Sequence, residues 1–402
     1  MRIAIVSDYF MDYVGGAQSS ILEQKASLEE QGHVVHLVAA VSASRGATAA
    51  VDLPIRALFT VPGLQLPVVA NSRRVVTRLA EYFYAEGIQV VHPQTEFGLA
   101  NAAVTAARQL GLPVVHTVHT LYWTSTGVGP TIAAPAMRAL LRRITGVQPP
   151  RHALSDRPSD NLLRNLTIAL SSRADVVVSP SEHQAADLAA TGLERLAVVP
   201  NPIARSHRPA VLLTAEQAAR PRILWVARCE PEKRPVVFAT AVLDALERTG
   251  GAFEVDFVGD GSELAEVRLL TADAPQFHVL GSLTHEAVLD LIDGSSIVAL
   301  TSYGFDNQPM TIAESVSRYR GVLFCDPRLR EGLGDSGALS ATPDATALAD
   351  TIVDLVTHPE RLVALSEGAE RDSTTFSAAT YVERVLAVYR DAACIAAAAQ
   401  TD

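Results

Sequence analysis

Short hydrophobic runs alternate along this chain with longer segments whose apolar residues recur at helical spacing. In the first half the strand-like runs are 3–6, 34–40, 90–92, 114–119, 176–179 and 197–199. Helix-length segments lie between them, at 17–31, 72–86 and 100–110. This alternation is typical of a doubly wound, mainly parallel α/β sheet.

The same alternation restarts after an irregular interval. From Pro200 to Pro221 the chain is polar and aperiodic, and strand-like runs then follow at 223–227, 254–258, 278–280, 297–300 and 322–325. We therefore expect two Rossmann-like domains, at 1–202 and 203–375, followed by a terminal helix at 376–402. Ligands bind such sheets at the carboxyl ends of the strands, so two facing sheets would form one central cleft.

Composition excludes several classes of function. A chain of 402 residues, 48% hydrophobic, can build two full cores, and a net charge of −11 argues against broad binding to nucleic acid. Three cysteines stand far apart, at Cys229, Cys325 and Cys394, which indicates neither a disulfide framework nor a zinc site. Without a signal-peptide pattern or about 18 uninterrupted apolar residues, we expect a cytoplasmic protein with no membrane span.

The most informative stretch is 306–314, which places Asp306 and Glu314 on either side of a strand-to-helix junction. A buried-type strand precedes it, and Pro309 suits the first turn of a helix, so free backbone N–H groups should face any phosphate at that helix start. Glu314 lies among apolar residues and needs a polar partner. The plainer alternative is that Glu314 pairs with a core arginine and Asp306 makes an Asx-turn.

Two further loops follow strands with residues suited to phosphate. Gly15 and Gly16 would allow close approach of backbone to a diphosphate, although a bare turn is the simpler interpretation. After the strand at 223–227, Arg228 and Lys233 could present a fork and a point charge to phosphate oxygens. Alternatively, Lys233 pairs at the surface with Glu230 or Glu232.

An acid followed by seven residues and then Glu resembles the signature of the family 4 retaining glycosyltransferases, as do the Gly-Gly pair and the Arg…Pro-Glu-Lys motif. Most members begin the first signature with Glu, whereas this chain has Asp306, one methylene shorter. The resemblance implies that Asp306 binds hydroxyls of the transferred sugar and Glu314 the ribose. It implies donor binding by a set of further residues: Gly15, Gly16, Arg228, Lys233, Val279, Gly281, Asn307, Gln308 and Met310.

The resemblance also assigns a histidine near the reacting sugar, here His119. His119 ends the strand-like run 114–119, while His116 should point to the opposite face. Three roles remain open for His119: catalytic base, donor positioning, or an ordinary satisfied core histidine. Within the resemblance, Arg228, Lys233, Asp306 and His119 form the catalytic set, and the two cations stabilise the departing nucleoside diphosphate. No Asp-x-Asp motif is present, so we expect no metal and no cofactor.

The resemblance implies the GT-B fold, with an acceptor-side first domain, a donor-binding second domain and a terminal helix that crosses back to the first. From the sequence alone, an ordinary last helix of the second domain is the open alternative. The expected reaction moves a hexosyl unit from a UDP- or GDP-sugar to an acceptor hydroxyl on a glycan, lipid or small molecule, with retention. Rivals are a silent sugar-nucleotide-binding protein and a same-fold epimerase or phosphorylase. Residues 136–145 read as an amphipathic helix with three arginines, either a solvated surface helix or a peripheral membrane contact.

Overall fold

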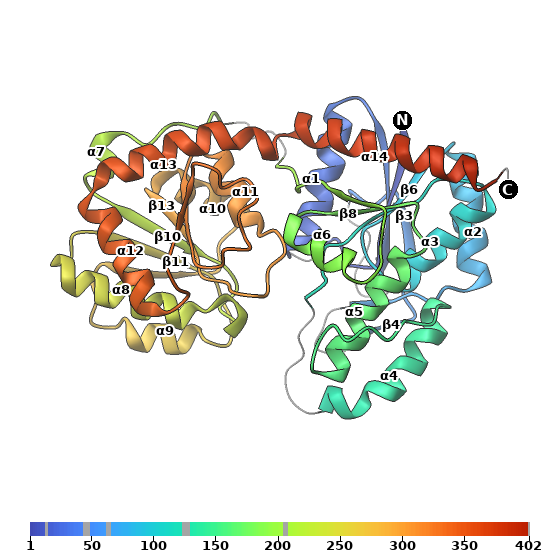
Figure 1. Ribbon diagram of the computed structural model, residues 1–402, viewed down its shortest axis with the longest axis horizontal. Coiled ribbons are helices and arrows are strands. Elements are labelled where there is room, and N and C mark those ends of the chain that lie inside the picture. Colours follow the sequence, from blue (N-terminus) through green and yellow to red (C-terminus); the bar gives the residue numbers. More distant parts are fainter. Residues whose placement is uncertain (13–14, 43–48, 62–65, 123–128, 204–207, 401–402) are drawn as a thin grey trace. The chain divides into compact units, whose positions relative to one another are not determined.

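The computed structural model describes residues 1–12, 15–42, 49–61, 66–122, 129–203 and 208–400, with the backbone alone at 129–133. The chain divides into two compact units, which Figure 1 shows as separate groups of strands and helices. Unit 1 comprises residues 1–204 together with 378–402, and unit 2 comprises residues 205–377. The final helix therefore belongs with the first part of the chain.

Unit 1 is built on parallel strands in the order β3-β2-β1-β6, continued by β7-β8-β9. A parallel bridge between Val91 and Val114 joins the two sets. Their bounds are β1 Arg2–Ser7, β2 Val34–Val41, β3 Leu53–Arg56, β6 Val90–Pro93, β7 Val115–Thr117, β8 Val176–Ser179 and β9 Leu196–Val198. A separate antiparallel pair is formed by β4 (Phe59–Val61) and β5 (Leu66–Val68).

The helices of unit 1 include one from the far end of the sequence. They are α1 Gly16–Glu30, α2 Arg73–Ala85, α3 Gly98–Gln109, α4 Gly129–Thr145, α5 Pro158–Ser171, α6 Glu182–Ala189 and α14 Ala378–Ala398. On α14, Tyr381, Val385 and Tyr389 are buried in one hydrophobic cluster with Ile5 and Ile21. Figure 1 shows α14 in red beside α1.

Unit 2 repeats the same plan. Its parallel sheet has the order β12-β11-β10-β13-β14-β15, which is the Rossmann order 3-2-1-4-5-6. The strands are β10 Arg222–Val226, β11 Glu254–Val258, β12 Phe277–Gly281, β13 Ile297–Leu300, β14 Gly321–Phe324 and β15 Gly337–Leu339. The helices are α7 Ala215–Ala218, α8 Pro235–Thr249, α9 Leu264–Leu270, α10 His285–Gly294, α11 Met310–Ser317, α12 Ala345–Thr357 and α13 Pro359–Asp372, with short 3₁₀ turns at Pro231–Lys233 and Ser373–Phe376. The prediction of doubly wound parallel α/β sheets is confirmed.

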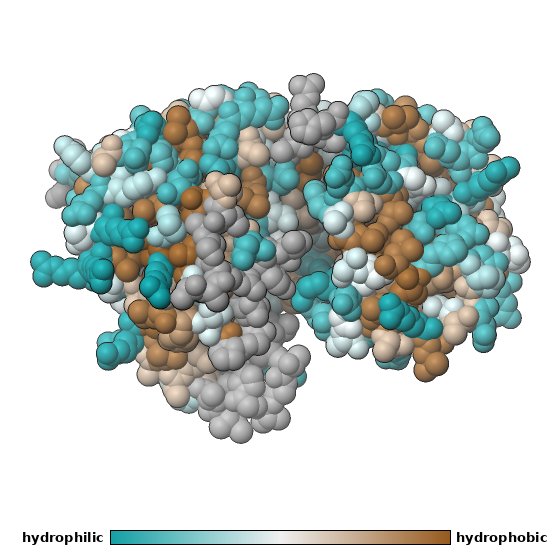
Figure 2. All heavy atoms as spheres, turned by 180° about the vertical axis from the view of Figure 1, so that it is seen from behind, coloured by the Kyte–Doolittle hydropathy of each residue, from teal (hydrophilic) through white to brown (hydrophobic). Residues whose placement is uncertain are grey.

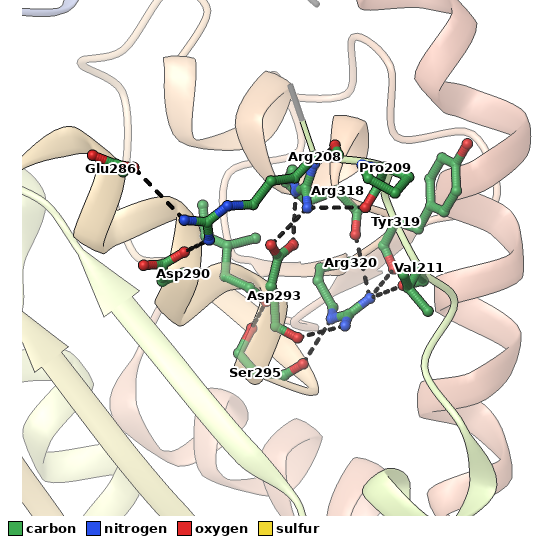
Figure 3. Close-up of polar contacts among 11 residues, drawn as sticks. Arg208, Pro209, Val211, Glu286, Asp290, Asp293, Ser295, Arg318, Tyr319 and Arg320 are labelled. Carbon is green, nitrogen blue, oxygen red and sulfur yellow. Dashed lines mark hydrogen bonds and ion pairs between the residues drawn. The ribbon is translucent and has the colours of Figure 1, made fainter. Parts of the chain in front are cut away.

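A buried arginine pair fastens the beginning of unit 2 to its own sheet (Figure 3). Arg320 donates to the backbone oxygens of Val211 at 2.7 Å and Ser295 at 2.8 Å. Arg318 donates to the backbone oxygen of Arg208 at 2.7 Å and pairs with Asp293 at 2.6 Å. Both side chains are nearly fully buried. Residues 208–211 are thus held to unit 2 by arginine N–H groups.

Candidate functional site

The loops after β10, β11 and β12 are hydrogen-bonded to one another at the carboxyl edge of the unit 2 sheet. The N–H of Cys229 donates to the oxygen of Asp260, and the N–H of Gly259 donates to the oxygen of Gly281, both at 2.9 Å. Gly259 has φ +146°, and a Cβ there would lie 1.9 Å from the oxygen of Ala227. Gly259 therefore allows the loop after β11 to pack closely against the end of β10, which holds the residues after β10 in place.

Lys233 and Asp306 are brought together from loops 73 positions apart. The Lys233 ammonium donates to both carboxylate oxygens of Asp306, at 2.5 and 2.7 Å. Only 16% of the Lys233 side chain and 11% of the Asp306 side chain are exposed. The backbone oxygen of Lys233 also accepts from the hydroxyl of Thr301, at 2.7 Å. Two of the predicted site residues therefore form one compact, paired group, and neither the surface pairing of Lys233 nor the Asx-turn of Asp306 is observed.

Arg228 lies on the same edge but is not part of that pair. Its guanidinium contacts Glu232, at 2.9 Å, and more than half of its side chain is exposed. A short exposed pair of this kind contributes little to stability and can be exchanged for another anion. Arg228 can therefore bind a phosphate oxygen and lose only its weak contact with Glu232.

Helix α11 begins one residue later than the sequence predicted. Pro309 is the N-cap, Met310 is the first helical residue, and no side chain caps the helix start. One turn further, Glu314 contacts the ring of His285, at 3.0 Å, and not a core arginine. Glu314 is mostly buried and His285 mostly exposed. The start of α11 thus combines free N–H groups with a carboxylate held by a replaceable partner.

The remaining residues predicted for the donor side lie at loop and strand ends. Val279 and Gly281 are in the last part of β12, and Gly281 has φ +72° with open space beside its Cα. Gln308 is buried, whereas Asn307 and Met310 are partly exposed. His285 was missed by the sequence analysis. The sequence feature that could have indicated His285 is its position. Thr284 caps α10, so His285 is the first helical residue after the loop that follows β12.

In unit 1 the Gly-Gly pair begins helix α1. Gly15 is the N-cap in extended conformation, with φ −153°, and offers no side-chain cap. A Cβ added to Gly16 would meet no atom within 4 Å. These glycines therefore do not serve a left-handed turn. What they provide, among the described residues, is a helix start without a side-chain cap, which suits an anion.

His119 lies two residues beyond β7, which ends at Thr117 and not at His119 as the hydrophobic run predicted. Its Nε2 contacts the side-chain oxygen of Gln94, at 2.5 Å. The ring keeps some contact with solvent, yet dense protein surroundings lower the pKa of His119 to about 4. The imidazole is therefore neutral at pH 7.

Two other histidines and one carboxyl are also buried in unit 1. Burial lowers the pKa of His92 and of His116 to about 3. His92 contacts Tyr389 and Thr117, while His116 contacts Ser171. Asp8 accepts from the N–H groups of Leu99 and Ala100 at the start of α3, and burial raises the pKa of Asp8 to about 6 despite these bonds.

The amphipathic segment predicted at 136–145 is the second half of a longer helix, α4, which contains Pro135. Leu141 is buried against α5, whereas Met137 and Leu140 are 43% and 45% exposed. Arg138 is partly exposed and donates to the backbone oxygens of Pro149 and Pro150. Arg142 and Arg143 are exposed. Figure 2 shows hydrophobic surface with projecting hydrophilic side chains in this part of unit 1.

Metal centres and membrane spans are both missing from the described residues. Within them, no group of three or more His, Cys, Asp or Glu residues is placed to hold a metal ion. Across the same ranges, no helix combines the length and apolar character needed to cross a membrane.

Comparison with known families matches both parts of the chain. Residues 14–207 match the family described as Glycosyltransferase Family 4, and residues 220–358 match Glycosyl transferases group 1. Among curated proteins, an alpha-monoglucosyldiacylglycerol synthase of Streptococcus pneumoniae is 28% identical over 167 residues, which is 40% of this chain and 37% of that protein. One component of the human phosphatidylinositol N-acetylglucosaminyltransferase is 28% identical over 128 residues, 30% of this chain and 26% of its own length. The matched region thus spans less than half of either relative.

Solved structures resemble the fold over nearly the whole chain. The Anabaena protein HepE, crystallised with UDP, is 14% identical with a TM-score of 0.66 and covers 96% of this chain and 99% of its own. The pneumococcal O-GlcNAc transferase GtfA, crystallised with UDP and GlcNAc, is 9% identical with a TM-score of 0.68, over 98% and 99% of the two chains. The family matches, together with two sheets of Rossmann order, lead to one assignment: this chain belongs to the family 4 glycosyltransferases and has the GT-B fold.

Proposed function

We propose that this glycosyltransferase transfers a hexosyl unit from a UDP-sugar to the hydroxyl of a membrane-lipid acceptor, with retention at the anomeric carbon and without a metal ion. The observation that carries the donor assignment is the Lys233–Asp306 pair beside the uncapped start of α11. A diphosphate can take the ammonium of Lys233 while sugar hydroxyls take the carboxylate of Asp306. Both partners of the pair thereby exchange one polar contact for another.

Glu314 completes the donor site in this proposal. A ribose offers two hydroxyl donors, and a mostly buried carboxylate held by one exposed histidine can accept them. Cleavage of the bond between the sugar and the diphosphate adds one negative charge to the departing diphosphate, and the cations Lys233 and Arg228 stabilise it. In unit 1 we assign His119 to a sugar hydroxyl and the start of α1 at Gly15 and Gly16 to phosphate.

Support for UDP and for a lipid acceptor comes from similar proteins. UDP is bound in the HepE and GtfA crystals, and the two curated relatives are named for glycosylated diacylglycerol and phosphatidylinositol. The exposed side of α4 fits a lipid acceptor, because Met137 and Leu140 can enter an interface while Arg142 and Arg143 meet anionic headgroups.

The first experiment measures transfer by the full chain from UDP-glucose, UDP-N-acetylglucosamine and GDP-mannose to diacylglycerol or phosphatidylinositol in vesicles, with soluble sugars as alternative acceptors. Lys233→Ala should lower kcat about 100-fold or more, and Glu314→Ala should raise the KM for the donor about 10- to 100-fold. Arg248→Ala, at an exposed ion pair on α8, is the control. Full activity of both site variants would refute the donor assignment, and NMR of the new glycosidic bond reports retention.

The second experiment tests the membrane surface. Each basic residue near an anionic surface contributes about 1 kcal/mol, so Arg142→Ser with Arg143→Ser should weaken binding to anionic vesicles about 30-fold. Sedimentation with vesicles measures this, and raised salt should reduce wild-type binding. The matched control exchanges Arg220 and Arg268, two exposed arginines of unit 2, for serine. Equal loss in the two double variants would show that total charge, and not α4, carries the binding.

A further inference from the structure

We propose that Gln94 is a positioning residue that fixes His119 as the tautomer protonated on Nε2, so that Nδ1 accepts a hydrogen bond from a hydroxyl of the sugar substrate. The inference rests on the proposed function, in which His119 contacts that sugar. It adds a residue that no sequence motif indicated and gives each ring nitrogen of His119 a distinct role.

The support is a buried chain of hydrogen bonds behind His119. The side-chain oxygen of Gln94 faces Nε2 of His119, at 2.5 Å, and the amide nitrogen of Gln94 donates to the side-chain oxygen of Gln24, at 3.0 Å. That same oxygen accepts from the hydroxyl of Tyr381, at 2.9 Å. Gln24 in turn donates to Ser20 and Asn201, each at 3.1 Å. Gln94 and Gln24 are both 1% exposed, so no water competes for their orientation.

The direction of these bonds determines the tautomer. Because the Gln94 amide nitrogen is used by Gln24, its oxygen is left to His119, and an oxygen requires a proton on Nε2. Over the described residues, Nε2 makes the one hydrogen bond of the His119 ring. With a pKa of about 4 the ring carries no second proton at pH 7, so Nδ1 presents a lone pair.

A lone pair on Nδ1 can accept a hydrogen bond from a hydroxyl and cannot donate one. Such a group orients a sugar hydroxyl and discriminates against a sugar that lacks it. If both glutamine amides were turned over, the chain of bonds would run in reverse and Nδ1 would carry the proton. The two arrangements make opposite predictions for the same ring, which makes the inference testable.

The chain of bonds also ties helix α14 to His119. Tyr381 and Tyr389 are both buried tyrosines of α14, and both hydroxyls are hydrogen-bonded within unit 1. Only the Tyr381 hydroxyl contacts Gln24, since that of Tyr389 contacts His92 at 2.8 Å. Replacing each tyrosine with phenylalanine removes one hydroxyl from the same helix, so Tyr389→Phe is a matched control for Tyr381→Phe.

The first measurement is nitrogen-15 NMR of the histidine rings in the full-length protein at pH 7. A His119→Asn variant identifies the His119 signals. We expect a neutral ring protonated on Nε2 in the wild type and in Tyr389→Phe, and a mixture of tautomers in Gln94→Leu. A single Nδ1-protonated form or an imidazolium in the wild type would overturn the inference. Retention of one pure tautomer in Gln94→Leu would equally remove the role of Gln94.

The second measurement compares transfer kinetics with donors that lack single sugar hydroxyls. In the wild type, loss of the hydroxyl bound by Nδ1 should lower kcat/KM about 10-fold, and in Gln94→Leu the same loss should cost about 3-fold or less. Tyr381→Phe should give an intermediate value and Tyr389→Phe the wild-type value. Identical discrimination in all four proteins would contradict the proposal.

The two measurements separate the inference from the function on which it rests. Absence of transfer with every donor and acceptor would refute the proposed function, while the NMR spectrum would still report the tautomer. Transfer together with an Nδ1-protonated His119 would refute the inference alone. Correct folding of Gln94→Leu is checked by its thermal unfolding.

Discussion

Buried histidines make the stability of unit 1 depend on pH. In the unfolded chain a histidine titrates near 6.5, whereas burial lowers the pKa of His92 and His116 to about 3 and that of His119 to about 4. Between about pH 6.5 and these values the unfolded state binds protons that the folded state does not. Each of these histidines therefore removes about 1.4 kcal/mol of stability per pH unit as the pH falls through this window.

Asp8 acts in the opposite direction. Its folded pKa of about 6 lies above the unfolded value of 3.8, so the folded state binds the extra proton between these values and gains stability as the pH falls. One carboxyl cannot offset three histidines. Thermal unfolding followed from pH 7.5 to 4 should show a falling melting temperature for unit 1, and Asp8→Asn should make the fall steeper between pH 6 and 4. A melting temperature that stays constant over this range would contradict the assigned burial.

The pairing of Lys233 with Asp306 could be predicted from sequence as a shared position at one edge of the sheet. Lys233 is one of only two lysines in the chain, and Asp306 follows a strand that adjoins β10, so the parallel sheet brings both to one edge. Gln94, Gln24 and His285 could not be predicted in the same way. Their roles depend on which neighbour each side chain meets, and glutamines and a surface histidine have no distinctive spacing.

The arginine pair after α11 holds residues 208–211 to unit 2 through buried hydrogen bonds. Arg320 donates to five backbone oxygens, those of Val211, Asp293, Ser295, Arg318 and Tyr319. Arg320→Ala would leave buried carbonyls without donors, and each costs about 1 to 3 kcal/mol. We expect a loss of more than about 3 kcal/mol in the free energy of unfolding of unit 2, measured by urea denaturation.

Arg208 supplies the matched control for this change. Its side chain is more than half exposed and meets Asp290 and Glu286, as Figure 3 shows, so Arg208→Ala should cost less than about 1 kcal/mol. Its backbone oxygen, which Arg318 uses, is unaffected by the substitution. Similar losses in the two variants would mean that the buried hydrogen bonds of Arg320 contribute no more than an exposed ion pair.

Elements with strong periodicity were predicted within a few residues, and weak ones were missed. Strands β3, β4, β5 and β15 have three or four residues each and lack a distinct hydrophobic run. The overestimate of β7 has a clear cause. Val118 continues its apolar pattern and is buried, yet the regular pairing ends at Thr117. In most of the sheet the buried residues are also the paired ones. Where a residue is buried but not paired, the hydrophobic pattern alone predicts the wrong end of the strand.

For the whole molecule, the two Rossmann sheets follow from the repeated alternation of strands and helices. The grouping of α14 with unit 1 was predicted from the family resemblance and not from the hydrophobic periodicity. The periodicity of an amphipathic helix indicates which of its faces is apolar, but not which hydrophobic core that face packs against. In the structure that face meets Ile5 and Ile21, and two of its tyrosines find polar partners in unit 1. The polar partners of the two tyrosines therefore distinguish the core that α14 packs against, which the hydrophobic pattern does not.

The division of the chain into 1–204 with 378–402, and 205–377, means that the sequence of unit 2 is complete before that of unit 1. Domains generally fold as the growing chain emerges, the earliest first. Here the nascent chain has delivered every strand of unit 2 while unit 1 still waits for the helix that covers Ile5 and Ile21. The later-encoded unit can therefore complete its core first, while Ile5 and Ile21 of the earlier one stay uncovered until α14 has been synthesised.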